Sequence, residues 1–171
     1  MVITGAVADV LEEIDGVSIK VMSPDGTEID AATAPVDEDD GSFDYLHSIS
    51  DNPDEGVYTV WARYGDWQEY SYFIADVEDD TVVVELDNQE YEPGDEVTIT
   101  GTIDNPIEGE EDIQVTVLDP NNDILLELIP IDGDEFEYSF DLDDDAELGR
   151  YAVIVDYAGG QSGAALFDVL Q

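Results

Sequence analysis

Basic side chains are almost absent from this chain, in which 171 residues include three lysines and arginines against 46 aspartates and glutamates. The formal net charge of −43 compares with a magnitude of about 2–8 for an ordinary small domain. A chain without a basic patch releases no counterions from a polyanion, so nucleic acid is excluded as a partner. Anionic membrane surfaces are excluded for the same reason. We expect cations as small partners and a saline medium, because salt screens the self-repulsion.

Cysteine is absent as well, which excludes disulfide bonds and thiolate chemistry. No apolar run reaches the length of a membrane-spanning helix, so direct membrane insertion is not expected. Nucleophile–base catalysis lacks its usual groups, because His47 is the single histidine and no nucleophile elbow surrounds the nearby Ser48 and Ser50. Carboxylates are so abundant that a pair of them carries no signal for glycosidase chemistry. We therefore predict that His47 lies on the surface or on an edge strand, and that the chain is not an enzyme.

The chain contains two copies of one unit. Gly5 corresponds to Gly101, and after a three-residue difference in a loop Phe43 corresponds to Phe136. Further pairs keep the spacing of the phenylalanines: Tyr45 with Tyr138, Gly56 with Gly149, Tyr58 with Tyr151, and Tyr64 with Tyr157. Within each copy, short runs of alternating apolar and polar residues are separated by turns rich in glycine, proline, asparagine and aspartate. This pattern predicts an all-β sandwich.

A local motif sharpens the fold prediction. The sequences DEGVYTV at 54–60 and ELGRYAV at 147–153 share an acidic residue, Gly, Tyr and Val in fixed spacing. They resemble the tyrosine corner of immunoglobulin-like sandwiches, in which the hydroxyl bonds to backbone just upstream. Tyr58 and Tyr151 are the corner residues. The cysteine of that pattern is replaced by Val60 and Val153, so packing alone must hold the core.

Three runs in the second copy point to a family: LDNQEYEPGDEVTITG at 86–101, VTVLDPN at 115–121 and GRYAVIVDY at 149–157. They resemble the immunoglobulin-like repeats of archaeal surface proteins, notably the S-layer and secreted proteins of ammonia-oxidising archaea. The resemblance covers the second copy and most of the first. It implies two tandem immunoglobulin-like β-sandwich domains, at 1–78 and 79–171, in an extracellular structural protein of the cell surface.

By the same resemblance, the first domain lacks its N-terminal strand. The second copy has lead-in segments at 82–86 and 91–97 ahead of its TITG strand, whereas the first copy begins at that strand. Three explanations stay open: the chain is part of a longer array, a neighbouring subunit supplies the strand, or residues 81–86 serve the first domain. Val82, Val84 and Leu86 are thus predicted interface residues, with copies of this chain or neighbouring immunoglobulin-like domains as partners.

Calcium is the expected cofactor, because hard cations require several carboxylate and carbonyl oxygens converging from one loop. Dense acidic clusters occur at 37–40 and 76–80, and neither has the spacing of an EF-hand. The candidate metal ligands are Asp76, Glu78, Asp79, Asp80, Asp37, Asp39 and Asp40. The cluster at 76–80 is preferred because it lies at the junction of the two domains. For either cluster alone, a solvated acidic loop is the simpler interpretation.

Aromatic side chains gather in a part of the first copy that has no aromatic counterpart in the second. By alternation Trp61 points away from the core face, and Trp67, Tyr70 and Tyr72 follow it. These residues are predicted either to pack against the neighbouring domain or to form a contact patch for a partner subunit or a carbohydrate.

These features predict a structural component of an archaeal cell-surface layer or extracellular filament. Assembly would use β-strand complementation and cation-bridged acidic loops. The alternatives are an adhesin-like stalk that binds a glycan or a protein, and accessory domains of a larger secreted protein.

Overall fold

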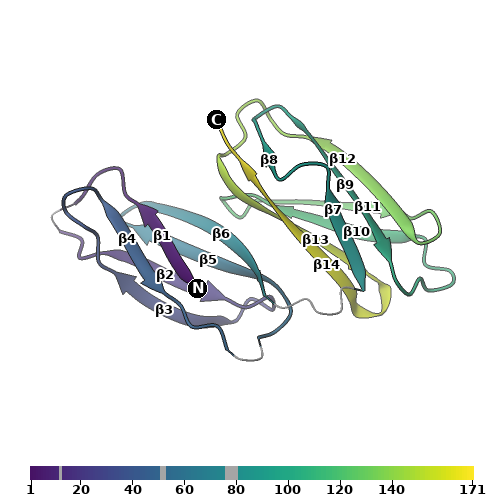
Figure 1. Ribbon diagram of the computed structural model, residues 1–171, viewed down its shortest axis with the longest axis horizontal. Coiled ribbons are helices and arrows are strands. Elements are labelled where there is room, and N and C mark those ends of the chain that lie inside the picture. The colour runs from purple at the N-terminus through teal and green to yellow at the C-terminus, as the bar shows by residue number, and fades with distance from the viewer. Residues whose placement is uncertain (12, 51–52, 76–80) are drawn as a thin grey trace.

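The computed structural model describes residues 1–11, 13–50, 53–75 and 81–171. Within these residues the chain forms two β-sandwiches in tandem, coloured purple to teal and teal-green to yellow in Figure 1. The predicted all-β, immunoglobulin-like fold is confirmed. The predicted boundary between residues 78 and 79 lies outside the described residues.

The first unit has a two-stranded sheet and a four-stranded sheet. In the small sheet, β1 (Val2–Ala6) pairs antiparallel with β4 (Ser42–Leu46). The large sheet has the order β3-β2-β5-β6. Its strands are β2 (Val17–Met22), β3 (Glu28–Ala34), β5 (Gly56–Tyr64) and β6 (Trp67–Ala75). All pairings in this sheet are antiparallel.

The second unit repeats this arrangement with two further strands. One sheet has the order β12-β9-β7 and the other the order β11-β10-β13-β14-β8. Their bounds are Val82–Leu86 for β7, Glu90–Tyr91 for β8, Glu96–Ile103 for β9, Asp112–Leu118 for β10, Ile124–Pro130 for β11, Glu135–Asp141 for β12, Gly149–Tyr157 for β13 and Gln161–Val169 for β14. A single 3-10 turn, η1 (Ala158–Gly160), precedes β14. Among the described residues, no helix has the length and apolar character needed to cross a membrane.

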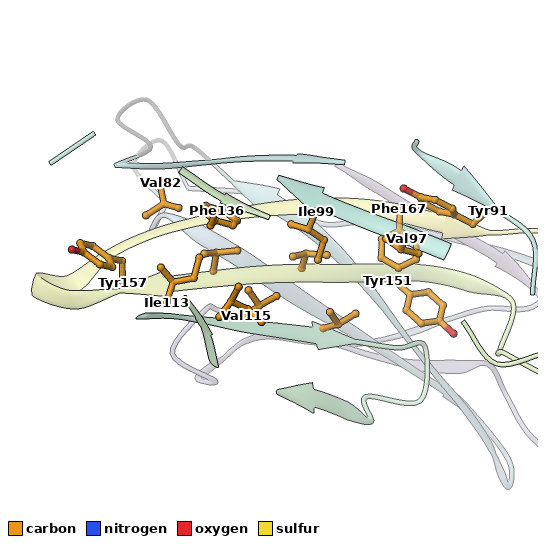
Figure 2. Close-up of a cluster of buried hydrophobic side chains, with 14 of the residues drawn as sticks. Val82, Tyr91, Val97, Ile99, Ile113, Val115, Phe136, Tyr151, Tyr157 and Phe167 are labelled. Carbon is orange, nitrogen blue, oxygen red and sulfur yellow. The ribbon is translucent and has the colours of Figure 1, made fainter. Parts of the chain in front are cut away.

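The cores of both units follow from the two-residue period of the strands. In the second unit Val97 and Ile99 of β9 face Ile113 and Val115 of β10, and all four side chains are fully buried (Figure 2). The first unit buries Val17, Ile19, Ala34, Val60 and Tyr64 in the same way. Each unit therefore has its own hydrophobic core.

Both predicted tyrosine corners are confirmed. The Tyr58 hydroxyl donates to the carbonyl of Asp54, and the Tyr151 hydroxyl donates to the carbonyl of Glu147, each over 3.0 Å. A second pair of tyrosines fixes a loop in each unit. The hydroxyl of Tyr64 accepts a hydrogen bond from the Leu11 N–H over 2.9 Å, and that of Tyr157 accepts one from the Ile107 N–H over 2.8 Å. The duplication therefore extends to individual hydrogen bonds.

The edge strand β11 is unusual in its exposure. Its sequence ILLELIP contains one acidic residue, and Ile124, Leu126 and Leu128 of its outer face are largely exposed. The equivalent strand in the first unit, β3, has the more polar sequence EIDAATA. An apolar edge strand of this kind is a template for pairing with another chain.

Candidate functional site

The site that distinguishes the two units lies along β1. In the second unit β9 pairs with β12 on one side and with β7 on the other. In the first unit β1 pairs with β4 in the same register, and its second edge receives no strand from the described residues. One edge of the first sandwich is therefore open.

The backbone groups at this open edge can be identified. The Val7 N–H donates to Gly41 and the His47 N–H donates to the carbonyl of Met1, so the odd-numbered residues of β1 bond toward β4. Because bonding direction alternates along an antiparallel strand, the N–H and C=O groups of Val2, Thr4 and Ala6 point toward the open edge.

The core behind this edge is less well covered than its counterpart. Ile99 of β9 is 0% exposed and Ile103 is 2% exposed. Their equivalents in the first unit, Ile3 and Val7, are half-buried. We attribute the loss of cover to the open edge of β1, because Phe43 and Tyr45 of β4 have identical counterparts, Phe136 and Tyr138, on β12.

A groove of about 360 Å³ runs between β1 and β6. Its apolar part is lined by Ile3, Val7, Val17, Phe43, Val60 and Ala62, and Trp67, Glu69 and Ser71 of β6 form the other wall. In the second unit the corresponding space contains β7. The carbonyl of Val83 lies 2.1 Å from the position that a Cβ on Gly101 would have. At the equivalent Gly5, the atoms nearest to such a Cβ all belong to the Phe43 ring.

This arrangement decides one of the alternatives left open by the sequence. The hypothesis that residues 81–86 serve the first unit is wrong, because β7 pairs with β9. Val82 is fully buried in the core of the second unit, and Val84 and Leu86 pack against that core. These predicted interface residues are thus used within the second unit.

The predicted aromatic patch is divided between two faces. Tyr70 and Tyr72 alternate with Trp67 along β6, so they lie on opposite faces of the sheet. Trp67 is 63% exposed and lines the groove. Trp61 pairs in register with Tyr70, and the Lys20 ammonium lies 5.6 Å from its ring centroid. The sequence therefore identified the aromatic residues but did not predict that they lie on opposite faces of the sheet.

Tyr70 and Tyr72 contact the second unit. Tyr72 is buried in a cluster with Val57 and Ala152, and its hydroxyl donates to the carbonyl of Asp119 over 2.7 Å. The Tyr70 N–H donates to the carbonyl of Pro120 over 2.9 Å. Burial raises the pKa of Tyr72 well above its usual value. Of the two predictions for these aromatics, packing against the neighbouring domain holds for this pair.

The acidic clusters show no metal-binding geometry among the described residues, where no group of three or more potential ligands converges. Asp76, Glu78, Asp79 and Asp80 lie outside the described residues. Asp37 Oδ1 accepts the Asp39 N–H over 2.8 Å, and Asp40 Oδ1 accepts the Ser42 N–H over 2.9 Å. In this loop two carboxylates thus stabilise the turn itself.

His47 differs from the prediction. It is 4% exposed, so the expected surface position is wrong, although it directly follows the edge strand β4. Its Nδ1 lies 2.6 Å from Oδ2 of Asp30, which also accepts the Tyr45 hydroxyl over 2.8 Å. These hydrogen bonds from His47 and Tyr45 hold the pKa of the Asp30 carboxyl below its usual value.

The repeat contained a signal for this burial. His47 corresponds to Phe140, which packs against the core of the second unit. The inward position is compatible with a histidine because Asp30 provides a hydrogen-bond acceptor.

The similarity of this chain to known proteins is distant. No protein-family model matches the chain, and no curated protein matches it. Native alpha-2-macroglobulin of E. coli aligns with 91% of this chain at 16% identity and a TM-score of 0.48. Salmonella alpha-2-macroglobulin reacted with methylamine aligns with 99% of it at 15% identity and a TM-score of 0.39. A DUF4785 family protein from Legionella pneumophila aligns with 98% of it at 12% identity and a TM-score of 0.39.

This chain spans 10%, 13% and 56% of those three chains, respectively. At these identities the likeness concerns the fold alone.

Proposed function

We propose that this chain is a structural module of an extracellular assembly at the cell surface, such as an archaeal surface layer or filament. It assembles with copies of itself or with neighbouring immunoglobulin-like domains. Assembly uses strand complementation at the open edge of the first unit. The observation that carries the proposal is the groove between β1 and β6, whose counterpart in the second unit contains a strand.

The open edge supports the proposal because natural sandwiches cover such edges. The free backbone groups of Val2, Thr4 and Ala6 would bond to an added strand, and the exposed flank of Ile3 would gain cover. Strand addition combines main-chain hydrogen bonds with side-chain pockets at alternate positions. The groove provides both the free main-chain groups and the apolar pocket that strand addition requires.

The net charge of −43 sets the conditions for assembly. Two such chains repel each other at low ionic strength, and the Debye length falls to about 3 Å at 1 M salt. Cations, with calcium among them, would neutralise facing carboxylates and allow close approach. Assembly is thus expected to require molar salt or divalent cations.

Sedimentation velocity of the intact chain tests the proposal, in molar salt with and without millimolar calcium. We expect large, uniform species under at least one of these conditions. A sharp monomer in both would overturn self-assembly.

A matched pair of variants locates the contact. Thr4→Pro removes an N–H that faces the open edge and leaves the β1–β4 hydrogen bonds intact. It should abolish the large species, whereas Thr4→Ala should retain them. Equal sedimentation of the two variants would place the contact elsewhere.

A second candidate function is glycan binding by an adhesin-like stalk. It is favoured by Trp67, which is exposed beside a groove, because aromatic rings stack on apolar sugar faces. Titration with oligosaccharides, followed by tryptophan fluorescence, should give a saturable change that Trp67→Ala abolishes. A flat titration would exclude this function and leave the structural role, in an assembly or as accessory domains of a secreted protein.

A further inference from the structure

The groove of the first unit specifies the strand that fills it. The repeat supplies a template, because β9 and β1 align through Gly101 and Gly5 and both pair with a phenylalanine-bearing strand. In the second unit Val84 lies opposite Gly101 and Leu86 lies opposite Ile99. The corresponding positions on β1 are Gly5 and Ile3.

The direction of the strand follows from the same template. β7 runs antiparallel to β9, and the N–H groups of Asp87 and Asp104 bond to the carbonyls of Thr98 and Thr81 across this pair. These bonds involve even-numbered residues of β9 and its extension. Their equivalents in the first unit are Val2 and Ala8, which belong to the same alternating set as Thr4 and Ala6.

Glu69 prevents a strand in this groove from following the whole path that β7 takes in the second unit. In the second unit the carbonyl of Val82 lies 1.8 Å from the position that a Cβ on Gly163 would have. Gly163 pairs with Val155, and Glu69 occupies the matching place on β6 by pairing with Ala62. The Cβ of Glu69 therefore closes the path that β7 takes across its sheet. A strand in the groove must leave β6 at this point.

We infer that the occupant of this groove is an extended polypeptide segment that runs antiparallel to β1. Its apolar side chains at two alternate positions face the core at Gly5 and Ile3. Its backbone bonds to Val2, Thr4 and Ala6, and it diverges from the path of β7 where it reaches Glu69. This inference rests on the proposed function, and it adds the chemistry, the direction and the register of the partner segment.

A fusion of the full chain tests the inference. By the spacing of Gly5 and Gly101, Met1 corresponds to Val97. A second copy of residues 81–96 placed directly before Met1 thus offers the groove a strand with its natural connection. Both tryptophans, Trp61 and Trp67, lie in the first unit, so their fluorescence reports the melting of that unit. The fusion should raise its melting temperature by about 10 °C, through the burial of two apolar side chains.

Two variants of the fusion serve as controls. Val84→Asp together with Leu86→Asp in the added copy should remove the gain, because the inward positions then carry charges. Glu69→Gly should enlarge the gain, since it restores the path that β7 follows over Gly163. A fusion that melts within about 2 °C of the parent chain, together with a failed peptide titration as described next, would overturn the inference.

A peptide experiment keeps the test independent of how the fusion folds. The peptide of residues 81–89, added to the intact chain, should shift the Trp67 emission to shorter wavelength in a saturable manner. The peptide with aspartates at positions 84 and 86 should not. Absence of saturation with the first peptide, together with an unstabilised fusion, would exclude a strand site here.

Sedimentation velocity of the parent chain and of the fusion shows which molecule supplies the natural occupant. Large species that the fusion abolishes would identify a second copy as the partner and support both proposals. A monomeric parent with a stabilised fusion would support the groove as a strand site, overturn self-assembly, and identify a donor other than a second copy of residues 1–171. The inference and the proposed function can therefore fail separately.

Discussion

β9 and β1 have equivalent neighbours on one side, β12 and β4, whereas on the other side β9 pairs with β7 and β1 receives no strand from the described residues. Both contain the sequence Ile-Thr-Gly, and both pair with a strand whose phenylalanine ring covers the glycine. Ile99 is fully buried beneath β7, while Ile3 is half-buried beside the groove. Equal sequences thus reach different burial, and the difference shows that one added strand closes the core of this sandwich.

The largest expected effect comes from truncating these two isoleucines. Ile99→Ala should lower the free energy of unfolding of the second unit by about 2–5 kcal/mol, because it leaves a cavity in a closed core. Ile3→Ala should cost about 1 kcal/mol, since its side chain is already partly exposed. Denaturant unfolding in molar salt, followed by circular dichroism for both units and by tryptophan fluorescence for the first, measures the difference. Equal costs would mean that Ile3 is as well covered as Ile99.

A proline at matched positions probes the hydrogen bonds. Thr100→Pro should destabilise the second unit by about 3 kcal/mol, because Thr100 bonds toward β7. Thr4→Pro should cost well under 1 kcal/mol in the monomer, since its N–H faces the open edge. Thermal melts of the two variants, with Thr100→Ala and Thr4→Ala as controls, give the comparison. A large loss with Thr4→Pro alone would show that the edge of β1 is not free.

Removal of the hydroxyl from either tyrosine corner should cost the same free energy of unfolding, in contrast to the variants on β1 and β9. Tyr58→Phe and Tyr151→Phe each remove one hydrogen bond to a backbone carbonyl. Each should cost about 1 kcal/mol, measured by denaturant unfolding with the two probes above. A clear inequality would show that the open edge weakens the first unit beyond the groove itself.

The smallest expected effect concerns pH and is particular to the first unit. The pKa of Asp30 is lowered in the folded state by its hydrogen bonds with His47 and Tyr45. Its contribution to stability is therefore present above its ordinary pKa of 3.8 and lost as the pH falls through the folded-state value. Asp30→Asn should destabilise the first unit at pH 6, and the difference should shrink on acidification. Unfolding curves from pH 6 to pH 3 measure it, and a constant difference would exclude the carboxylate as its cause.

Much of the fold could be predicted because its determinants are local. Alternating runs such as residues 151–157 define strands, and the spacing of Gly and Tyr defines each corner. The assignment of β7 could not be made, since the apolar pattern of residues 82–86 suits either sandwich. Pairing with β9 decides it through contacts that are distant in sequence.

The candidate site could likewise be predicted only in part. The sequence predicted an open edge in the first unit, because residues 1–171 contain a single copy of the lead-in segment. It did not indicate that Trp67 faces the groove while Tyr72 bonds to Asp119, 47 residues away. The Asp30–His47 pair was missed for a related reason. Asp30 pairs with Val21 as Leu125 pairs with Val117, so an apolar position in one unit is a polar one in the other.

The exposed strand β11 has a consequence for the colloidal behaviour of the protein. An apolar edge such as Ile124–Pro130 invites stacking of one molecule on another, and the negative surface keeps molecules apart at neutral pH. The charge therefore acts as a kinetic barrier to precipitation. Because the isoelectric point lies near 4.1, acidification removes this barrier while the edge strand keeps its apolar side chains. The acidic surface thus opposes association through β11 at neutral pH and ceases to oppose it near the isoelectric point.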